Sequence, residues 1–147
     1  LQLVLAGKID NNYRLLQKYV KNRGVTDVVF TDFVSEGELR GLYENARAYV
    51  FPSLSEGFGL PGLEALAHGL PLVSSRATCL PEIYKDAAIY FDPNSTNDMV
   101  AKIKLVLEDK ELASRLRQKG PRVAAQYSWQ TMAKQTLALY EQILKGR

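Results

Sequence analysis

The sequence predicts an α/β protein whose strands form a parallel sheet with helices on both faces. Two observations lead to this prediction. Short apolar runs alternate with stretches of helical periodicity from one end of the chain to the other, a pattern typical of successive β-α-β units. The strand at the start of the chain, Leu1–Ala6, is almost continuously apolar, as expected for a strand covered on both faces.

Five short strands are expected; Gly7 ends the first of them and Pro52 ends the third. In chain order they are Leu1–Ala6, Val28–Phe30, Tyr49–Phe51, Leu72–Ser74 and Ala88–Phe91. In open sheets of this kind, ligands bind outside the carboxyl ends of the strands. The loops expected to matter most are therefore Gly7–Asn12, Thr31–Ser35, Ser53–Gly62 and Ser74–Pro81.

Helices are expected between and after these strands. The first ends at Gly24, and the second begins with a capping box formed by Ser35 and Glu38. A short helix near Leu63–His68 follows the Gly/Pro-rich loop. Ser95 or Thr96 is expected to cap the next helix. Another helix should begin at about Lys110, and Gly120-Pro121 should kink or end it. Ser128 is expected to cap the last helix.

Several aromatic side chains lie on the apolar stripes of these helices. We expect them to be core residues rather than stacking platforms for a ligand: Tyr13, Tyr19, Tyr43 and Trp129. His68, the only histidine, is expected to be a buried or half-buried structural residue. The apolar stripe of the last helix could lack a partner within this chain, and such an exposed patch would favour self-association into a homo-oligomer.

Composition limits the classes of function. The 147 residues suggest about one domain, and 46% hydrophobic with 24% charged residues excludes a disordered chain. The net charge of +3 is scattered, which suits an anionic small ligand and does not indicate nucleic-acid binding. With a single cysteine, Cys79, and no apolar run of about 18 residues, we expect a cytoplasmic protein, with weak contact to an anionic membrane face left open.

The loop Ser53–Gly62 carries the clearest chemical signal. It holds three glycines within six residues and leads into a helix, whose free N–H groups form an anion site. Glu56 and Glu64 bracket this site, and because carboxylates repel phosphates they are better suited to accept hydrogen bonds from hydroxyls. A nucleotide sugar offers both groups. The alternative is structural: Glu64 would only interact with the helix dipole, and Glu56 would be a solvated loop residue.

The loop closely resembles the signature of retaining glycosyltransferases of family 4. The resemblance rests on Ser55–Pro61 together with Glu56 and Glu64, which are separated by seven residues. It extends over essentially the whole chain, through the segments Val50–Ser53, Glu64–Ala67, Gly69–Ser74, Leu80–Glu82, Phe91–Pro93 and Tyr127–Trp129. It implies a Rossmann-like, three-layer α/β/α domain that forms the C-terminal, donor-binding half of a GT-B architecture.

The same resemblance implies the roles of the loop residues. Glu64 would bind the ribose hydroxyls of a nucleotide-diphospho-sugar. Glu56 would be the catalytic residue that contacts the donor sugar and orients its anomeric carbon. The residues that would offer backbone N–H groups to the sugar and diphosphate are Gly57, Phe58, Gly59 and Leu60. No metal ligands and no cofactor are implied, because the nucleotide sugar is itself the substrate.

Further donor contacts are implied near the start of the chain, where the sequence also departs from the family. Thr31, Asp32 and Phe33 would border the base, mainly through main-chain atoms, although glycine is usual at the position of Asp32. Gly7-Lys8-Ile9 stands where many members have Gly-x-Gly, so Lys8 could point differently or could partly compensate for cationic residues missing from the diphosphate site. The chain as given would lack the domain's first strand-helix unit and the N-terminal acceptor domain.

The expected function is glycosyl transfer from a nucleotide-diphospho-sugar with retention of anomeric configuration. This chain would supply the donor-binding half, with the missing acceptor domain as its partner, and would be inactive alone. Two alternatives stay open: a nucleotide-sugar epimerase or phosphorylase relative, and a non-catalytic nucleotide-binding or assembly module. The sugar, the base and the acceptor are not specified by any side-chain pattern in the sequence.

Overall fold

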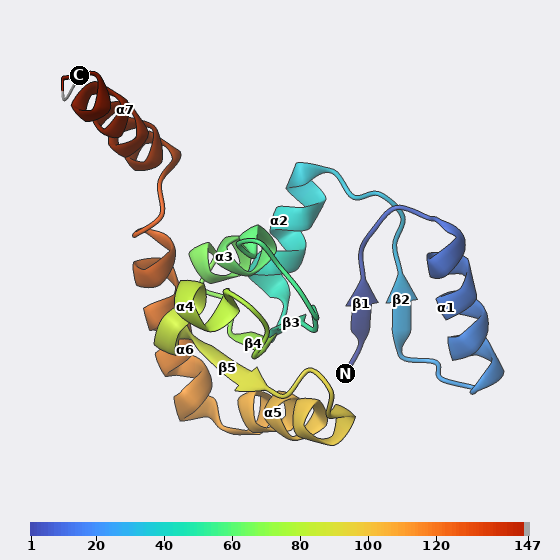
Figure 1. Cartoon of the computed structure of the whole chain (residues 1–147). Helices are drawn as coiled ribbons and strands as arrows, with labels where there is room; N and C mark the ends of the chain where they lie inside the picture. Colours follow the sequence, from blue (N-terminus) through green and yellow to red (C-terminus); the bar gives the residue numbers. More distant parts are fainter. Residues whose placement is uncertain (146–147) are drawn as a thin grey trace. The chain divides into compact units, whose positions relative to one another are not determined.

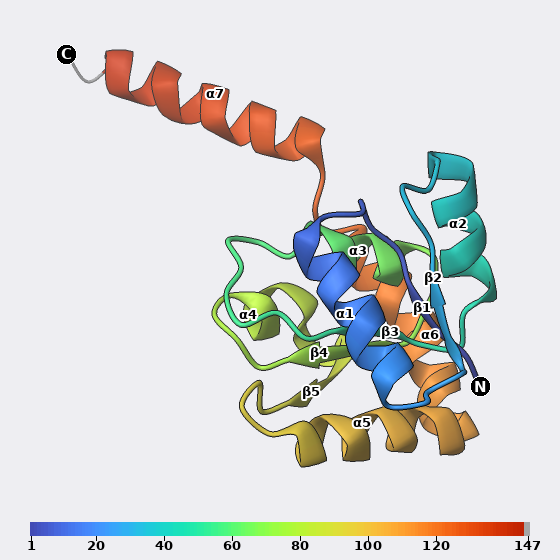
Figure 2. The same ribbon diagram turned by 90° about the vertical axis from the view of Figure 1, so that its right-hand side faces the viewer.

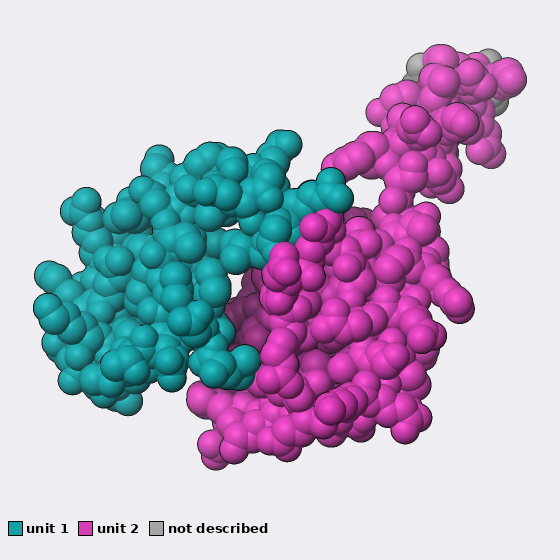
Figure 3. Space-filling model, turned by 180° about the vertical axis from the view of Figure 1, so that it is seen from behind, with its two compact units in different colours: residues 1–42 teal, residues 43–147 magenta. Residues whose placement is uncertain are grey.

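The computed structural model describes residues 1–145. The chain divides into two compact units, Leu1–Leu42 and Tyr43–Arg147, which Figure 3 shows in teal and magenta. Every strand pair in both units is parallel, as the sequence predicts. The strands form two hydrogen-bonded sheets, one in each unit, in place of the single sheet expected. We describe each unit by itself.

The first unit is built on a two-stranded sheet. Strand β1 (Leu3–Leu5) pairs with β2 (Val28–Phe30), and helix α1 (Asn11–Asn22) connects them (Figure 1). The register places Leu3 beside Val28 and Leu5 beside Phe30. Asp10 caps α1 by accepting a hydrogen bond of 2.7 Å from the N–H of Tyr13. This side-chain cap satisfies one of the free N–H groups at the start of the helix.

Burial in the first unit is lower than the sequence predicts. In β1, Leu3 is 50% exposed, so this strand is not covered on both faces. Tyr19 is also exposed, with the guanidinium of Arg23 4.4 Å from its ring centre, and the prediction that it is a core residue is wrong. Tyr13 is half-buried and packs edge-on against Phe30. A two-stranded sheet offers a helix too little area to bury its whole apolar stripe.

Helix α2 (Glu36–Asn45) begins with the predicted capping box. The N–H of Glu38 donates to the Ser35 hydroxyl, and the N–H of Ser35 donates to the Glu38 carboxylate at 2.8 Å. The Ser35 hydroxyl also donates to the same carboxylate oxygen. These bonds lower the pKa of Glu38, since they stabilise its ionised form.

The second unit is a three-stranded sheet with helices on both faces. Strand β4 (Leu72–Ser75) lies between β3 (Tyr49–Phe51) and β5 (Ala88–Phe91). The other elements are α3 (Leu60–Ala67), α4 (Leu80–Tyr84), the short 3₁₀ helix η1 (Lys85–Ala87), α5 (Thr96–Glu108), α6 (Lys110–Ala124) and α7 (Trp129–Lys145). Figure 2 shows the sheet edge-on between α4 and α5.

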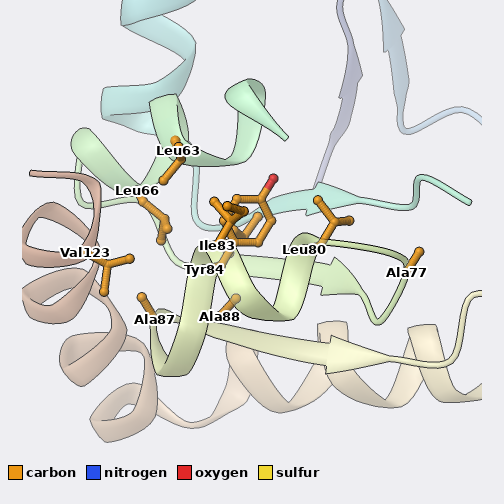
Figure 4. Close-up of a cluster of buried hydrophobic side chains, with 10 residues drawn as sticks. Leu63, Leu66, Ala77, Leu80, Ile83, Tyr84, Ala87, Ala88 and Val123 are labelled. Atoms are coloured by element: carbon orange, nitrogen blue, oxygen red, sulfur yellow. The ribbon is translucent and has the colours of Figure 1, made fainter. Parts of the chain in front are cut away.

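Side chains that alternate along β4 enter two separate cores. Leu72 joins a cluster with residues of α3, α4 and α6, including Leu66 and Tyr84 (Figure 4). Val73 points to the other face and packs with Phe91, Val106 and other residues. Since successive strand residues face opposite sides of a sheet, this pattern establishes the three-layer α/β/α arrangement.

Gly120-Pro121 was expected to kink or end helix α6; the helix does not end there but continues to Ala124. Proline removes one helical hydrogen bond, and burial on both sides of it offsets that loss. Gly120 is buried, and a Cβ at this position would lie 2.9 Å from the carbonyl oxygen of Leu66 in α3. Val123 is buried one turn later. The glycine therefore permits a close crossing of α3 and α6.

The last helix, α7, has its expected cap but no core residues. The Ser128 hydroxyl accepts from the N–H of Thr131 at 3.4 Å. Trp129 is 70% exposed, so the prediction that it belongs to the core is wrong. An apolar stripe is buried only where another element covers it, and every residue of α7 is exposed in the described chain. Among the described residues, no helix has the length and apolar composition needed to cross a bilayer.

Candidate functional site

The loop after β3 takes a conformation that only glycine adopts readily. Gly59 has φ of 86° and forms the N-cap of α3, without a side-chain cap. The helix begins at Leu60, three residues earlier than expected, with Pro61 in its first turn. The missing N–H of proline costs nothing at this position. The loop therefore leads directly into the N-terminus of α3, where the first backbone N–H groups have no partner within the helix.

Tyr84, at the end of α4, fixes this turn from below. Its hydroxyl donates a hydrogen bond of 2.6 Å to the carbonyl oxygen of Gly59. Its side chain is fully buried and occupies the space that a Cβ at Gly59 or Gly62 would need. Burial raises the pKa of Tyr84 above its usual value, so the hydroxyl stays a neutral donor. No local sequence pattern connects positions 59 and 84, so the sequence did not indicate this residue.

A second set of contacts ties the loop to the segment after β4. The N–H of Glu56 donates to the Thr78 hydroxyl at 3.1 Å, which in turn donates to the Glu56 carbonyl at 3.0 Å. The thiol of Cys79 lies 3.4 Å from the same carbonyl. Thr78 has φ of 43°, a left-handed conformation unusual for a β-branched residue. Hydrogen bonds therefore join the loop after β3 to the loop after β4. The sequence did not indicate this connection.

The turn leaves a run of backbone donors unpaired. Among the described residues, four consecutive backbone N–H groups donate no hydrogen bond. They belong to Gly57, Phe58, Gly59 and Leu60. Phe58 and Leu60 are exposed, and the Phe58 ring packs edge-on against Tyr127 at 5.4 Å. Consecutive free N–H groups at a helix N-terminus form a favourable site for a negatively charged or strongly accepting group.

The two carboxylates of the loop differ in their environment. Glu56 is half-buried, and its carboxylate has no hydrogen bond or ion pair in the described part of the chain. Glu64 is exposed and accepts a hydrogen bond of 3.2 Å from the hydroxyl of Tyr43, leaving its second oxygen available. Because α3 starts at Leu60, Glu64 lies in the second turn, beyond the reach of most of the helix dipole.

Tyr43 orients Glu64 through a group of packed rings. It is buried, stacks on His68 at 5.4 Å and packs edge-on against Tyr49. Burial, followed by Tyr49 and Glu64, raises the pKa of Tyr43 well above its usual value. His68 is exposed rather than buried or half-buried, so that expectation is wrong. It lies at the end of α3, where its ring covers Tyr43 while its other face meets solvent.

The other predicted site residues belong to the first unit. The Asp32 carboxylate accepts from the N–H of Ile9 at 3.3 Å and from the N–H of Phe33 at 2.7 Å. It thereby joins the loop that contains Lys8 to the loop Thr31–Ser35. Lys8 is exposed, and Phe33 is 81% exposed. The carboxylate that replaces the usual glycine is therefore bound to the backbone of both loops.

Tyr13, in α1, supports the loop after β2. Its hydroxyl donates to the carbonyl of Thr31, and Thr31 itself donates from its N–H to the carbonyl of Leu5 at 3.1 Å. Partial burial and the neighbouring Asp32 carboxylate raise the pKa of Tyr13. The sequence predicted that Tyr13 is a core residue and did not indicate this role. Thus Lys8, Thr31, Asp32 and Phe33 lie on joined loops of one unit, and the six loop and helix residues 56–60 and 64 lie in the other.

Among residues 1–145, no group of three or more His, Cys, Asp or Glu side chains is placed to hold a metal ion. The donors that the second unit offers are instead backbone N–H groups, and its acceptors are two carboxylates. This combination matches a ligand that carries both anionic groups and hydroxyls.

Comparison with known proteins identifies the family. Residues 1–123 match the model of the group described as "Glycosyl transferases group 1". The chain belongs to the group 1 glycosyl transferases. Two of its curated relatives are mannosyltransferases: O-antigen chain mannosyltransferase B of Escherichia coli, 38% identical over 76% of this chain, and the MMP alpha-(1->4)-mannosyltransferase of Mycolicibacterium hassiacum, 35% identical over 97%.

This group 1 glycosyl transferase chain spans 29% and 36% of the lengths of those two relatives. Among solved structures it resembles the C-terminal domain of a group 1 family glycosyl transferase from Francisella tularensis. The TM-score is 0.73 and the identity 26%, over 85% of this chain and 68% of that one. Together with other glycosyltransferase neighbours, this likeness confirms the predicted fold class, a Rossmann-like α/β half of a GT-B architecture.

Proposed function

We propose that this chain is the donor-binding half of a retaining glycosyltransferase of family 4, and that its donor is a nucleotide-diphospho-mannose. The mannosyl group is inferred from the two mannosyltransferase relatives. The observation that carries the proposal is the run of four unpaired N–H groups at Gly57–Leu60, flanked by Glu56 and Glu64.

Each side of this run suits a different part of the donor. The N–H groups of Gly57, Phe58, Gly59 and Leu60 bind the diphosphate and sugar oxygens. Glu64, with one oxygen held by Tyr43 and the other free, accepts hydrogen bonds from the ribose hydroxyls. Glu56, whose carboxylate has no partner among the described residues, accepts from the sugar hydroxyls and orients the anomeric carbon.

The chemistry of the leaving group supports the same assignment. When the bond between the anomeric carbon and the diphosphate breaks, negative charge grows on the diphosphate oxygens. N–H groups that are already fixed toward that charge stabilise it without reorganising. Tyr84 and Thr78 hold the turn in place before the donor arrives. We propose that the acceptor enters on the face the leaving group departs from, which retains the anomeric configuration.

For the first unit we propose contacts to the base and the diphosphate. The Asp32 carboxylate is bound to two backbone N–H groups, so Asp32 positions Thr31 and Phe33 rather than binding the base through its side chain. The exposed ring of Phe33 offers an apolar surface to a base. Lys8 is exposed and offers an ammonium group to the diphosphate. No metal or cofactor takes part in this proposal.

The relatives suggest that transfer needs more than this chain. The chain matches about a third of their length. We propose that an acceptor-binding domain completes the site, and that the 147-residue chain binds donor without transferring sugar. Turnover by the purified chain, measured as release of nucleoside diphosphate with any acceptor, would contradict this part of the proposal.

A binding titration tests the function. GDP-mannose, UDP-mannose, ADP-mannose and the free diphosphates are titrated into the wild-type chain, Glu64→Ala and Tyr43→Phe, with calorimetry as the readout. We expect saturable binding of one nucleotide, about tenfold weaker in Glu64→Ala, which is the loss of one charged hydrogen bond. Tyr43→Phe keeps the carboxylate and loses only its orienting bond, so a change of no more than about threefold is expected.

Two outcomes would contradict the proposal. Unchanged affinity in Glu64→Ala would remove the ribose assignment. Absence of saturable binding by every nucleotide would favour the alternative of a non-catalytic assembly module. Thermal unfolding of each variant shows whether it is folded before its affinity is interpreted.

A further inference from the structure

A hollow in the second unit is lined by three cationic side chains and no carboxylate. Its volume is about 240 Å³, and it lies where α5 ends and α6 begins. The residues that line it are Arg47, Val106, Leu107, Lys110, Ala113, Ser114 and Arg117. A surface with scattered charges, such as this chain has overall, does not by itself bring three cations to one hollow.

The hollow is built by regular structure rather than by flexible loops. Lys110, Ser114 and Arg117 follow one another at spacings of four and three along α6, so they share one face of that helix. Arg47 approaches from the segment before β3 and donates to the carbonyl oxygen of Leu107 at 2.7 Å. A carbonyl at a helix C-terminus attracts a cation. This bond uses one of the five guanidinium N–H donors and leaves the others available.

Among the described residues, no acidic side chain lines the hollow beside these cations. Lys110, Ser114 and Arg117 make no side-chain hydrogen bond or ion pair within the described residues. The nearest acidic residues in sequence have other partners: Asp109 caps α6 at the N–H of Leu112, and Glu111 pairs with Arg115 at 2.9 Å. Neither they nor Glu108 lines the hollow. Like charges held together without a counter-ion favour binding of an anion.

The hollow is separate from the proposed donor site. Arg47 precedes the amino end of β3, whereas the loop with Glu56 and Gly59 follows the carboxyl end of the same strand. The hollow and the proposed donor site therefore lie at opposite ends of the strands, the hollow at their amino ends and the donor site at their carboxyl ends. We infer that the hollow lined by Arg47, Lys110, Ser114 and Arg117 is a second anion site that binds a phosphate group, either free or in the headgroup of an anionic lipid. This inference does not rest on the proposed transferase function.

The test compares two double variants, each of which removes two cations of α5 or α6. Lys110→Gln with Arg117→Gln removes two cations of the hollow. Lys104→Gln with Arg122→Gln removes two exposed cations of α5 and α6 that have no partner among the described residues and do not line it. Both double variants carry the same net charge, so a general effect of charge weakens both equally. Thermal unfolding confirms that each variant is folded.

Two probes distinguish the sources of the phosphate. Pyrophosphate is titrated at constant ionic strength by NMR, following the backbone N–H signals of residues 106–117. Vesicles of phosphatidylcholine with and without 30% phosphatidylglycerol are tested by co-sedimentation. We expect binding to at least one probe, weakened tenfold or more in the Lys110/Arg117 variant and less than twofold in the control. Pyrophosphate binding indicates a free phosphate ligand, and binding to anionic vesicles alone indicates a headgroup.

Equal weakening in both double variants, or no saturable binding of either probe by the wild-type chain, would overturn the inference. The Glu64→Ala variant separates this test from that of the donor site. It is expected to bind the probe at the hollow as the wild-type chain does, even where its nucleotide affinity has fallen.

Discussion

The hydroxyl of Tyr84 donates to the carbonyl oxygen of Gly59 across 25 residues of sequence, at 2.6 Å. The tyrosine ring fills the space beneath Gly59 and Gly62, the two glycines that frame the start of α3. The unpaired backbone N–H groups of the loop thus belong to a turn that packs on a buried aromatic side chain, Tyr84, which is part of the hydrophobic core (Figure 4). This relationship couples the shape of the proposed donor site to the packing of the domain.

Tyr84→Phe should destabilise the chain while keeping its packing. The Gly59 carbonyl still accepts from the N–H of Gly62 at 3.2 Å, so the expected cost is that of one hydrogen bond, about 1 kcal/mol. Urea unfolding measures it, and the melting temperature should fall by about 2–4 °C. Tyr90→Phe, which removes a bond to the Lys85 carbonyl away from the loop, is the control. Donor affinity should fall in the first variant and stay unchanged in the second.

Gly59→Ala should be far more damaging than Gly57→Ala. At Gly59 a methyl group would overlap the Tyr84 hydroxyl and the side chain of Leu80, and the left-handed φ adds strain. We expect a loss of about 2 kcal/mol or more in the free energy of unfolding. A methyl group at Gly57 would have no neighbouring atom within 4 Å, and φ is not left-handed there, so this variant should stay within about 1 kcal/mol of wild type. Similar losses in both variants would contradict the role assigned to Tyr84.

Gly120→Ala and Gly41→Ala should change the free energy of unfolding in opposite directions, although both glycines lie in helices. A methyl group at Gly120 would press on the Leu66 backbone and force α3 and α6 apart, at a cost of about 1–3 kcal/mol. Gly41, in α2, has open space around it, so alanine should stabilise the chain by about 0.5–1 kcal/mol through helix propensity. Chemical unfolding of the two variants in parallel decides this; stabilisation by Gly120→Ala would show that the crossing is not tight.

The capping box of α2 predicts a dependence on pH. Hydrogen bonds from Ser35 lower the pKa of Glu38 in the folded chain. The stabilisation is therefore complete above the unfolded pKa of about 4.3, and it is lost as the pH falls through the lower folded value. Ser35→Ala removes the hydroxyl bond but keeps the backbone one, so the pKa should return part of the way toward normal. Carbon-13 NMR titration of Glu38 measures this, and an unchanged pKa would refute it.

Sequence patterns predicted those parts of the fold that depend on neighbouring residues. All five strands, the caps at Ser35, Ser95 and Ser128, and the helices that follow them are confirmed. Each rests on residues a few positions apart, whose spacing reflects the period of a strand or helix. Burial was predicted less well: Tyr19 and Trp129 lie on apolar stripes yet are exposed, because burial depends on which other element covers the stripe.

The sequence by itself determined the parallel α/β class and the family, and it located the glycine-rich loop with Glu56 and Glu64. Only the tertiary structure decided what holds that loop and which of its groups are free. Tyr84, Thr78 and Tyr43 act on residues 21 to 25 positions away, and the cations at Arg47 and Arg117 meet across 70 positions of chain. Such contacts arise from packing between helices, strands and loops that are distant in the sequence. The periodicity of residues within one helix or strand therefore does not predict them.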